Sequence, residues 1–293
     1  MKSVGVIVPC FNQGHFAAEC VASLRAQTYA NWRAVVLDDA STDDSWTTLQ
    51  TLASDRVSVV HLDRNLGRAL VRNEAVRRLG DVDYVLNIDC DDVLTPTYIE
   101  KLAAALDANP RAGLAYGLLH FFGAMEGNTW PSKPLVREAR FLENVIPGPS
   151  VLFRAEALRQ TKGWRREFTK SSGEDWDIWL QVVGAGWDVV WVRDAEYRYR
   201  QHSQSFLAQS SERTQIEVQL NLLGLHAKEI AGTVGLDAFL TPQVLPALLG
   251  AFRRGDVRYA SHLLRRLLRS APLATLSLVV RHYGRRLRAI LKR

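Results

Sequence analysis

Short apolar runs alternate with segments of helical periodicity along the first part of this chain. Runs rich in β-branched residues occupy four stretches, 4–8, 33–37, 57–62 and 82–88. Apolar residues at helical spacing follow the first three runs, in 16–27, 43–53 and 67–79, and recur in 97–110. Elements that alternate in this way predict an α/β protein with a mainly parallel sheet flanked by helices. The region that follows is less regular and is expected to be mixed.

A polar cluster follows each of the four apolar runs. The clusters read PCFNQG, DDASTDD, DRNLG and DCDD. Ligands of open α/β sheets bind at the carboxyl ends of the strands, so we expect these clusters to gather along one rim of the sheet. The last cluster holds three carboxylates, Asp89, Asp91 and Asp92, where repulsion and desolvation both cost free energy. It therefore needs a positive partner, and its hard oxygen atoms suit Mg²⁺ or Mn²⁺.

The chain changes character after about residue 210. Residues 211–293 are predicted to be almost wholly helical, and apolar side chains share one face of 256–270, opposite a face of arginines: Val257, Ala260, Leu263, Leu264, Leu267 and Leu268. Residues 251–293 contain twelve Arg or Lys and one acid, a net charge of +11, whereas the whole chain carries +6. This charge can serve a membrane, an acidic partner or nucleic acid, or be a solvated face. With few aromatic residues, it favours an anionic membrane over nucleic acid.

Composition and cysteine usage narrow the class of protein. The chain has 293 residues, of which 47% are apolar and 23% charged, as in ordinary globular proteins. The first apolar run is too short for a signal peptide or a membrane span, so a cytoplasmic protein is expected. Cys10, Cys20 and Cys90 are odd in number and lack metal-type spacing, which argues against a zinc site or a disulfide framework.

Five motifs in order are similar to those of family-2 glycosyltransferases. They read VIVPCFN, VVLDDASTDDS, NLGRALVRN, LNIDCDDVLTP and GEDWDIWLQVVGAGW, and a weaker sixth match reads YRYRQHSQS. That family consists of inverting enzymes that use nucleotide-diphospho-sugars and have a GT-A-type, Rossmann-like fold. The resemblance implies a catalytic domain at residues 1–210. No comparable motif occurs in 211–293, which we expect to form a helical, basic C-terminal extension.

The resemblance implies which residues bind the metal. Asp89 and Asp91 match the DXD motif that holds Mn²⁺ or Mg²⁺, and His202 matches a histidine that completes the metal shell in many relatives. Asp92 receives no role. Without a metal, the same carboxylates could instead act at the start of the next helix, where negative charge is favourable.

Other motifs correspond to the nucleotide and the diphosphate. A carboxylate at the end of the second strand can accept a hydrogen bond from the imide N–H of a pyrimidine, and the resemblance favours Asp39 for this contact. Pro9 and Asn12 are expected to frame the base, although both also suit a simple turn. Gly67 permits close backbone approach, and Arg72 matches the family's arginine near anionic groups. Each polar residue also has a structural alternative, an Asx turn or a surface arginine.

The GEDWDIW segment matches the catalytic part of the family. An inverting transfer needs one carboxylate to take the proton of the acceptor hydroxyl, and by resemblance this base is Asp175. An acidic first helical turn is the structural alternative. Trp176 suits either sugar stacking or the core. Residues 147–153 and Trp164 correspond to the acceptor side of related enzymes.

These expectations together describe a metal-dependent, inverting glycosyltransferase. A UDP-sugar is favoured over a dTDP- or GDP-sugar as donor, and the acceptor is a glycan or a lipid-linked glycan in cell-surface polysaccharide synthesis. The chain lacks the Gln-x-x-Arg-Trp signature of processive synthases, so single additions are expected. We expect contact with the inner membrane face through the basic helices and no nucleic acid. The alternatives are a nucleotidyltransferase, whose glycine-rich loop is absent, and a non-catalytic scaffold, which the intact carboxylates disfavour.

Overall fold

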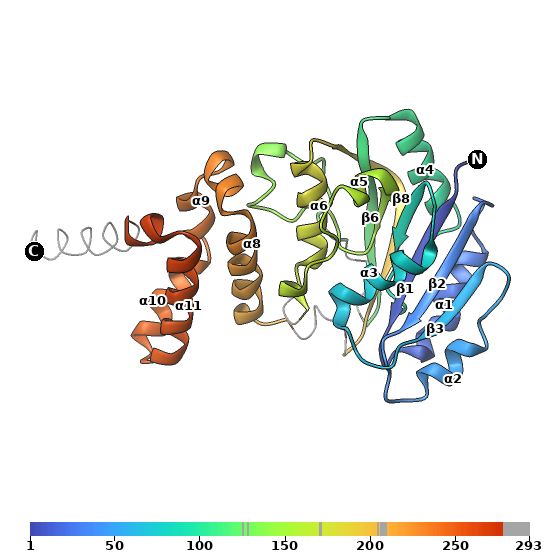
Figure 1. Cartoon of the computed structure of the whole chain (residues 1–293), viewed down its shortest axis with the longest axis horizontal. Helices are drawn as coiled ribbons and strands as arrows, with labels where there is room; N and C mark the ends of the chain where they lie inside the picture. The colour runs from blue at the N-terminus through green and yellow to red at the C-terminus, as the bar shows by residue number, and fades with distance from the viewer. Residues whose placement is uncertain (125, 128, 170–171, 204, 206–209, 278–293) are drawn as a thin grey trace, which may run out of the picture. The chain divides into compact units, whose positions relative to one another are not determined.

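The computed structural model describes residues 1–124, 126–127, 129–169, 172–203, 205 and 210–277. The chain divides into two compact units. The first comprises 1–137 and 144–210, and the second comprises 138–143 and the residues from 211 onward. Figure 1 shows that the strands belong to the first unit.

One eight-stranded sheet organises the first unit, in the order β3-β2-β1-β4-β7-β6-β8-β5. The strands are β1 (Val4–Cys10), β2 (Trp32–Asp38), β3 (Val57–His61), β4 (Tyr84–Asn87), β5 (Val93–Leu94), β6 (Ala112–Gly123), β7 (Val151–Arg154) and β8 (Asp188–Gln201). The strands β3, β2, β1 and β4 are mutually parallel, and β6 is parallel to β8. The strand β7 runs antiparallel to both β4 and β6, and β5 runs antiparallel to β8. The predicted mixed, mainly parallel α/β fold is confirmed.

Helices cover both faces of this sheet (Figure 1). They are α1 (Gly14–Arg25), α2 (Ser45–Gln50), α3 (Gly67–Leu79), α4 (Tyr98–Ala108), α5 (Ala155–Arg159) and α6 (Glu174–Gly184), with 3-10 turns η1 (Arg137–Ala139) and η2 (Arg166–Phe168). Alternate residues of β1 face opposite sides: Val4 and Val6 join the core cluster that contains residues of α1 and α4, whereas a Cβ at Gly5 would meet Leu79 of α3. The predicted helices are confirmed, although α2 is shorter than its periodic segment.

The second unit is helical over its described residues, as predicted. It contains α8 (Glu212–Thr233), α9 (Leu236–Leu240), α10 (Val244–Arg253) and α11 (Val257–Ser270). Residues 278–293 of the predicted helical extension lie outside the described residues. No helix among the described residues has the length and apolar character to cross a bilayer.

The predicted single apolar face of α11 needs correction. Ala260, Leu263 and Leu267 are buried, but Val257 and Leu268 are exposed. These two residues lie about 100° around the helix from the centre of the buried stripe, because successive residues turn by about 100°. The apolar set therefore divides into a buried stripe and an exposed edge.

Candidate active site

A cavity of about 860 Å³ lies at the carboxyl ends of the parallel strands. All four polar clusters contribute to its wall, through Pro9, Asn12, Asp39, Asn65, Gly67, Asp89 and Asp91. The predicted convergence on one rim is thus confirmed. The start of α6, with Asp175, and aromatic residues of later strands and loops also line it. The volume falls in the range of small-molecule sites.

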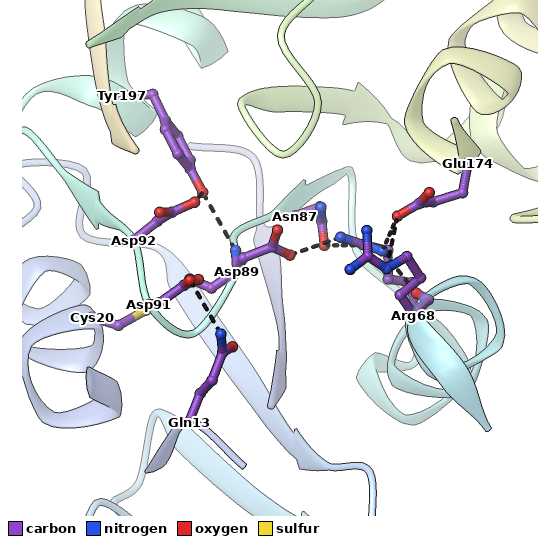
Figure 2. Close-up of polar contacts among 10 residues, drawn as sticks. Gln13, Cys20, Arg68, Asn87, Asp89, Asp91, Asp92, Glu174 and Tyr197 are labelled. Carbon is purple, nitrogen blue, oxygen red and sulfur yellow. Dashed lines mark hydrogen bonds and ion pairs between the residues drawn. The ribbon is translucent and has the colours of Figure 1, made fainter. Parts of the chain in front are cut away.

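Arg72 is the positive partner of part of the carboxylate cluster. Its Nη2 lies 2.7 Å from Asp89 Oδ1, and its Nη1 lies 3.0 Å from Glu174 Oε1. The Nε group donates to Asn87 Oδ1 at 3.1 Å. Figure 2 labels its three side-chain partners, Asn87, Asp89 and Glu174. Burial disfavours its charge, but Asp89, Asp175 and Glu174 together raise the pKa of Arg72.

This arrangement bears on the predicted role of Arg72. Arg72 is buried, and its guanidinium is bound by side chains of β4, the loop after it and α6. It lines the cavity, and its contact with an anionic donor stays a prediction. Glu174 is also buried, and its Oε2 has no hydrogen-bond partner in the described structure. No local pattern predicted that Arg72 would join the DCDD loop to the GEDW segment, because these motifs are far apart in the chain.

Asp91 and His202 come together as the resemblance implies. His202 Nε2 lies 2.9 Å from Asp91 Oδ2, which also accepts a hydrogen bond from Gln13 Nε2 at 3.3 Å. Burial, followed by the charge of Asp89, raises the pKa of Asp91, and His202 opposes this shift. Within the described residues, no group of three or more His, Cys, Asp or Glu side chains could hold a metal ion. Asp91 and His202 nevertheless provide two ligands of suitable chemistry, as for Mg²⁺ or Mn²⁺ completed by water and diphosphate.

Asp92, which had no predicted role, links the DCDD loop to β8 through hydrogen bonds. It is fully buried, with Oδ2 accepting from the Tyr197 hydroxyl at 2.6 Å and Oδ1 from the Arg200 N–H at 2.8 Å. Arg200 Nε also donates to the Asp91 carbonyl at 2.7 Å, while its guanidinium lies over the Phe16 ring. Sequence reasoning missed both partners, although they stand within the YRYRQH segment that it singled out.

Asp39, which follows β2, binds the backbone of the loop before α3. Its two carboxylate oxygens accept hydrogen bonds from the N–H groups of Leu66 and Gly67, at 2.7 and 2.9 Å. Burial raises the pKa of Asp39 against these bonds. Gly67 has a φ of 76°, and a Cβ there would lie 2.2 Å from Thr169 Cγ2, so a larger residue would be strained twice. Asp38, in contrast, is held by Ser41 and His61 and does not line the cavity.

Asn12 joins the loops that follow β1 and β2. Its backbone has a φ of 54°, in the left-handed region that asparagine tolerates. The Asn12 N–H donates to Ser41 Oγ at 2.9 Å, and the Asn12 Oδ1 accepts the Thr42 N–H at 2.8 Å. Pro9 lines the cavity near the end of β1. Both predicted base-framing residues therefore line the wall that also contains Asp39.

The three acids in the first turn of α6 have different surroundings. Glu174 is held by Arg72, and Asp177 is buried beside Arg165 and Gln181. Asp175 is partly exposed and lines the cavity. Burial raises its pKa to about 7, opposed by Arg72 and reinforced by Glu174 and Asp89. A carboxyl group with this pKa changes protonation state near neutral pH, as a general base must.

Aromatic residues form another part of the cavity wall, which sequence reasoning largely missed. Phe121, Trp130, Trp176 and Tyr199 all line it. Trp130 Nε1 donates to the Asn144 carbonyl at 3.3 Å, which fixes the indole. Trp164 is buried against Phe153 and does not line the cavity, so its predicted place on the acceptor side is wrong. Gly148 and Pro149, from the predicted 147–153 segment, do line it.

Comparisons with known proteins agree with this geometry. The family model described as "Glycosyl transferase family 2" matches residues 5–180. A putative glycosyltransferase, EpsE, of Bacillus subtilis (strain 168) is 29% identical over 215 residues, which cover 71% of this chain and 76% of that protein.

Two solved structures share the fold at 17% sequence identity. One is S. aureus TarS 1-349 in complex with UDP-GlcNAc, with a TM-score of 0.64 over 91% of this chain and 72% of that one. The other is the mannosyltransferase PcManGT from Pyrobaculum calidifontis in complex with GDP-Man and Mn²⁺. Its TM-score is 0.59 over 98% of this chain and 81% of that one. The expected GT-A-type fold is confirmed.

Proposed function

This chain belongs to glycosyl transferase family 2, and we propose that it is an inverting, non-processive enzyme that transfers a sugar from a nucleotide-diphospho-sugar to a hydroxyl acceptor. The observation that carries the proposal is the position of Asp175 in the same cavity as Asp89 and Asp91. A single displacement needs one carboxylate to take the proton of the acceptor, and Asp175, whose pKa burial raises to about 7, can do so near neutral pH.

The donor is proposed to lie along the strand ends. Pro9, Asn12 and Asp39 would meet the base, and Asp39 would accept the imide N–H of uracil through lone pairs that its two backbone hydrogen bonds leave available. This favours a UDP-sugar. Among the matched structures, one holds UDP-GlcNAc and another GDP-Man, so the nucleotide is a question for binding measurements.

Asp91 and His202 would hold Mn²⁺ or Mg²⁺, with Asp89 adding negative charge beside them. A bound divalent ion would stabilise the charge of the departing diphosphate. Arg72 lines the cavity, and besides its predicted contact with the donor it is proposed to position Asp89 and Glu174, which its guanidinium binds.

Asp175 is proposed as the general base. It would take the proton of the acceptor hydroxyl while that oxygen bonds to the anomeric carbon and the bond from this carbon to the diphosphate oxygen breaks. Attack opposite the leaving group inverts the configuration and needs no covalent intermediate. The aromatic wall, with Trp130 and Tyr199, offers apolar surface for the sugar rings of a glycan or lipid-linked glycan acceptor in cell-surface polysaccharide synthesis.

Calorimetry tests the donor site first. The protein is titrated with UDP, dTDP, GDP and CMP, each with Mn²⁺ and with chelator, and the series is repeated with Asp91→Ala. Binding of UDP that needs Mn²⁺ and is lost in the variant supports the proposal. Binding of GDP alone would replace the donor class, and binding of none would sink the donor site.

An acceptor screen then separates the enzyme from a non-catalytic scaffold. Nuclear magnetic resonance of the product reports the anomeric configuration, which should be opposite to that of the donor. A retained configuration would exclude the single displacement. Donor binding without transfer to any glycan acceptor would favour the scaffold.

A further inference from the structure

Large apolar side chains are exposed together near the end of the described chain. Between 37% and 81% of their surface is accessible, and they are Phe252, Val257, Leu268, Leu273 and Leu276. Elsewhere in the described residues, the exposed large apolar side chains are dispersed: Met1, Phe11, Val136 and Leu142. Single exposed apolar residues are ordinary on protein surfaces, whereas five within 25 residues indicate an interaction surface.

The helix α11 places apolar and basic residues side by side on its outer face. Val257, Leu264 and Leu268 follow one another at intervals of seven and four, so they lie along one side of the helix. Exposed arginines stand one position after each of them, at Arg258, Arg265 and Arg269. Because one residue turns the helix by about 100°, the arginines form a second line beside the apolar one. We call these six residues the outer face of α11.

The inner side of α11 has a different composition. Ala260, Leu263 and Leu267 are buried there, while Arg266 is bound by Glu217 and Asn221 of α8. The packing of the helical unit therefore uses the inner side and leaves the outer face on the surface. A stable packed helix would not need this second apolar line, so another partner is expected for it.

The charge around the outer face is almost entirely positive. Residues 251–277 contain six arginines and one acid, Asp256. That acid is bound to Arg213 at 2.7 Å and caps the start of α11 through the Tyr259 N–H. In a symmetric contact between two copies of this chain, this face would meet the same positive charge. Among described residues from 251 to 277, Phe252 and Tyr259 are the aromatic ones, which gives little base-stacking surface for nucleic acid.

We propose that the outer face of α11 and the segment up to residue 277 bind the surface of an anionic bilayer. The leucine and valine side chains would enter the boundary between head groups and acyl chains, and the arginines would bind lipid phosphates. The helix would then lie in the plane of the interface. This surface adds a partner to the proposed function and does not depend on it, because lipid binding requires neither donor nor acceptor.

Co-sedimentation with vesicles tests the proposal on the full chain. Wild-type protein is mixed with phosphatidylcholine vesicles and with vesicles containing one third phosphatidylglycerol, at 50 and 500 mM salt. We expect most of the protein to sediment with the anionic vesicles at low salt, and several-fold less at high salt or with neutral vesicles. Protein that stays in the supernatant with anionic vesicles at low salt would overturn the proposal.

Matched variants distinguish the outer face from a general basic surface. Leu268→Ser and the double variant Arg265→Gln with Arg269→Gln should each lower the bound fraction several-fold. The controls Val136→Ser and Arg111→Gln, which change exposed residues of the first unit, should bind as wild type. Helical circular dichroism confirms that each variant is folded. Equal losses in test and control variants, or a concentration-dependent dimer that Leu268→Ser abolishes without vesicles, would contradict the membrane assignment.

Discussion

At the scale of single residues, the acids of the cavity differ because their neighbours differ. Asp92 is buried and holds β8, whereas Asp91 meets His202. Asp175 lies two residues from Asp177 on the same helical turn but lines the cavity, and burial raises its pKa to about 7. Aspartates that are neighbours in the sequence thus have different surroundings in the structure.

The pH dependence of transfer follows from Asp175. A general base acts only when deprotonated, so the rate should rise with pH, with a midpoint near 7, and level off above it. Asp175→Asn should lower the rate by roughly 10²–10⁴-fold and remove this limb. A rate profile against pH at saturating substrates checks both. A variant that keeps wild-type turnover would disprove the assignment.

The raised pKa of Asp175 also affects stability, which should fall with rising pH, whereas the transfer rate should rise. The pKa of Asp175 in the folded protein lies above the usual value of about 4. Its contribution to the free energy of unfolding is therefore fully present below about pH 4. It is lost as the pH rises through about 7. Asp175→Asn removes the ionisable group, so its melting temperature should fall less than that of wild type between pH 5 and 8. Thermal melts across this range measure the difference, and parallel curves would contradict it.

Arg72 is proposed to position Asp89 and Glu174, so its loss should change both the stability of the protein and the pH dependence of transfer. Arg72→Met leaves Asp89 and Glu174 without their buried partner, which should cost about 3–5 kcal/mol of unfolding free energy. Because Arg72 lowers the pKa of Asp175, the midpoint of the rate profile should also move to higher pH. Denaturant unfolding and the pH profile check these effects. Arg72→Lys should restore part of both, and an unshifted midpoint in Arg72→Met would refute the electrostatic role.

At the scale of elements, the end of β8 holds the DCDD loop in place. Its side chains and backbone bind Asp92, and Arg200 Nε binds the Asp91 carbonyl. The next residue but one in the chain, His202, meets the carboxylate of Asp91. One strand therefore fixes both the backbone of the acidic loop and a proposed metal ligand.

Breaking this attachment should affect stability before it affects nucleotide choice. Asp92→Ala removes the acceptor of the Tyr197 hydroxyl and of the Arg200 N–H, and two buried unsatisfied donors should together cost about 2–6 kcal/mol. Tyr197→Phe removes the bond to Asp92 and a longer one from the Asp89 N–H at 3.4 Å, but it keeps the bond between Asp92 and the Arg200 N–H, so it should cost less. Urea unfolding compares the two variants. If Tyr197→Phe were as harmful as Asp92→Ala, the attachment to the Arg200 backbone would have no role.

The aromatic wall is predicted to act on the acceptor. Trp130→Ala should raise the acceptor KM on the order of tenfold, because a stacking surface worth about 1.4 kcal/mol is lost. Trp130→Phe should keep most of the affinity. Initial rates against acceptor, with donor affinity from calorimetry as the control, separate the two substrates. A change in donor affinity alone would move Trp130 to the donor side.

At the scale of the whole molecule, the cavity belongs to one unit and the proposed membrane surface to the other. The net charge of +6 hides this division, because residues 251–293 carry +11 and the rest of the chain carries −5. Catalysis and attachment are therefore expected to respond to different changes in the chain.

Donor binding should stabilise the unit that contains the cavity. With UDP and Mn²⁺ at about 100 times the dissociation constant, its unfolding free energy should rise by about 2.7 kcal/mol. Differential scanning calorimetry measures the rise in transition temperature, and chelator or Asp91→Ala should abolish its metal-dependent part. Leu268→Ser on the helical unit should keep the full rise. An equal rise with chelator would show that metal does not contribute to donor binding.

The sequence by itself determined the fold class and which strand-end motifs line the cavity. The alternation of apolar runs and helical segments predicted the sheet, because period and length are local properties. The strand-end motifs predicted that Asp39, Asp89 and Asp91 would share a rim, because parallel strands end at one edge.

Only the tertiary structure decided which atoms meet across that rim. Arg72 joins Asp89 to Glu174, Asp92 is buried under β8, Trp164 packs in the core, and Trp130 reaches the cavity wall. The exposed line of apolar residues on α11 also depended on which of its sides packs inward. Residues far apart in sequence form these contacts, and no local period specifies the partner or the direction of a side chain.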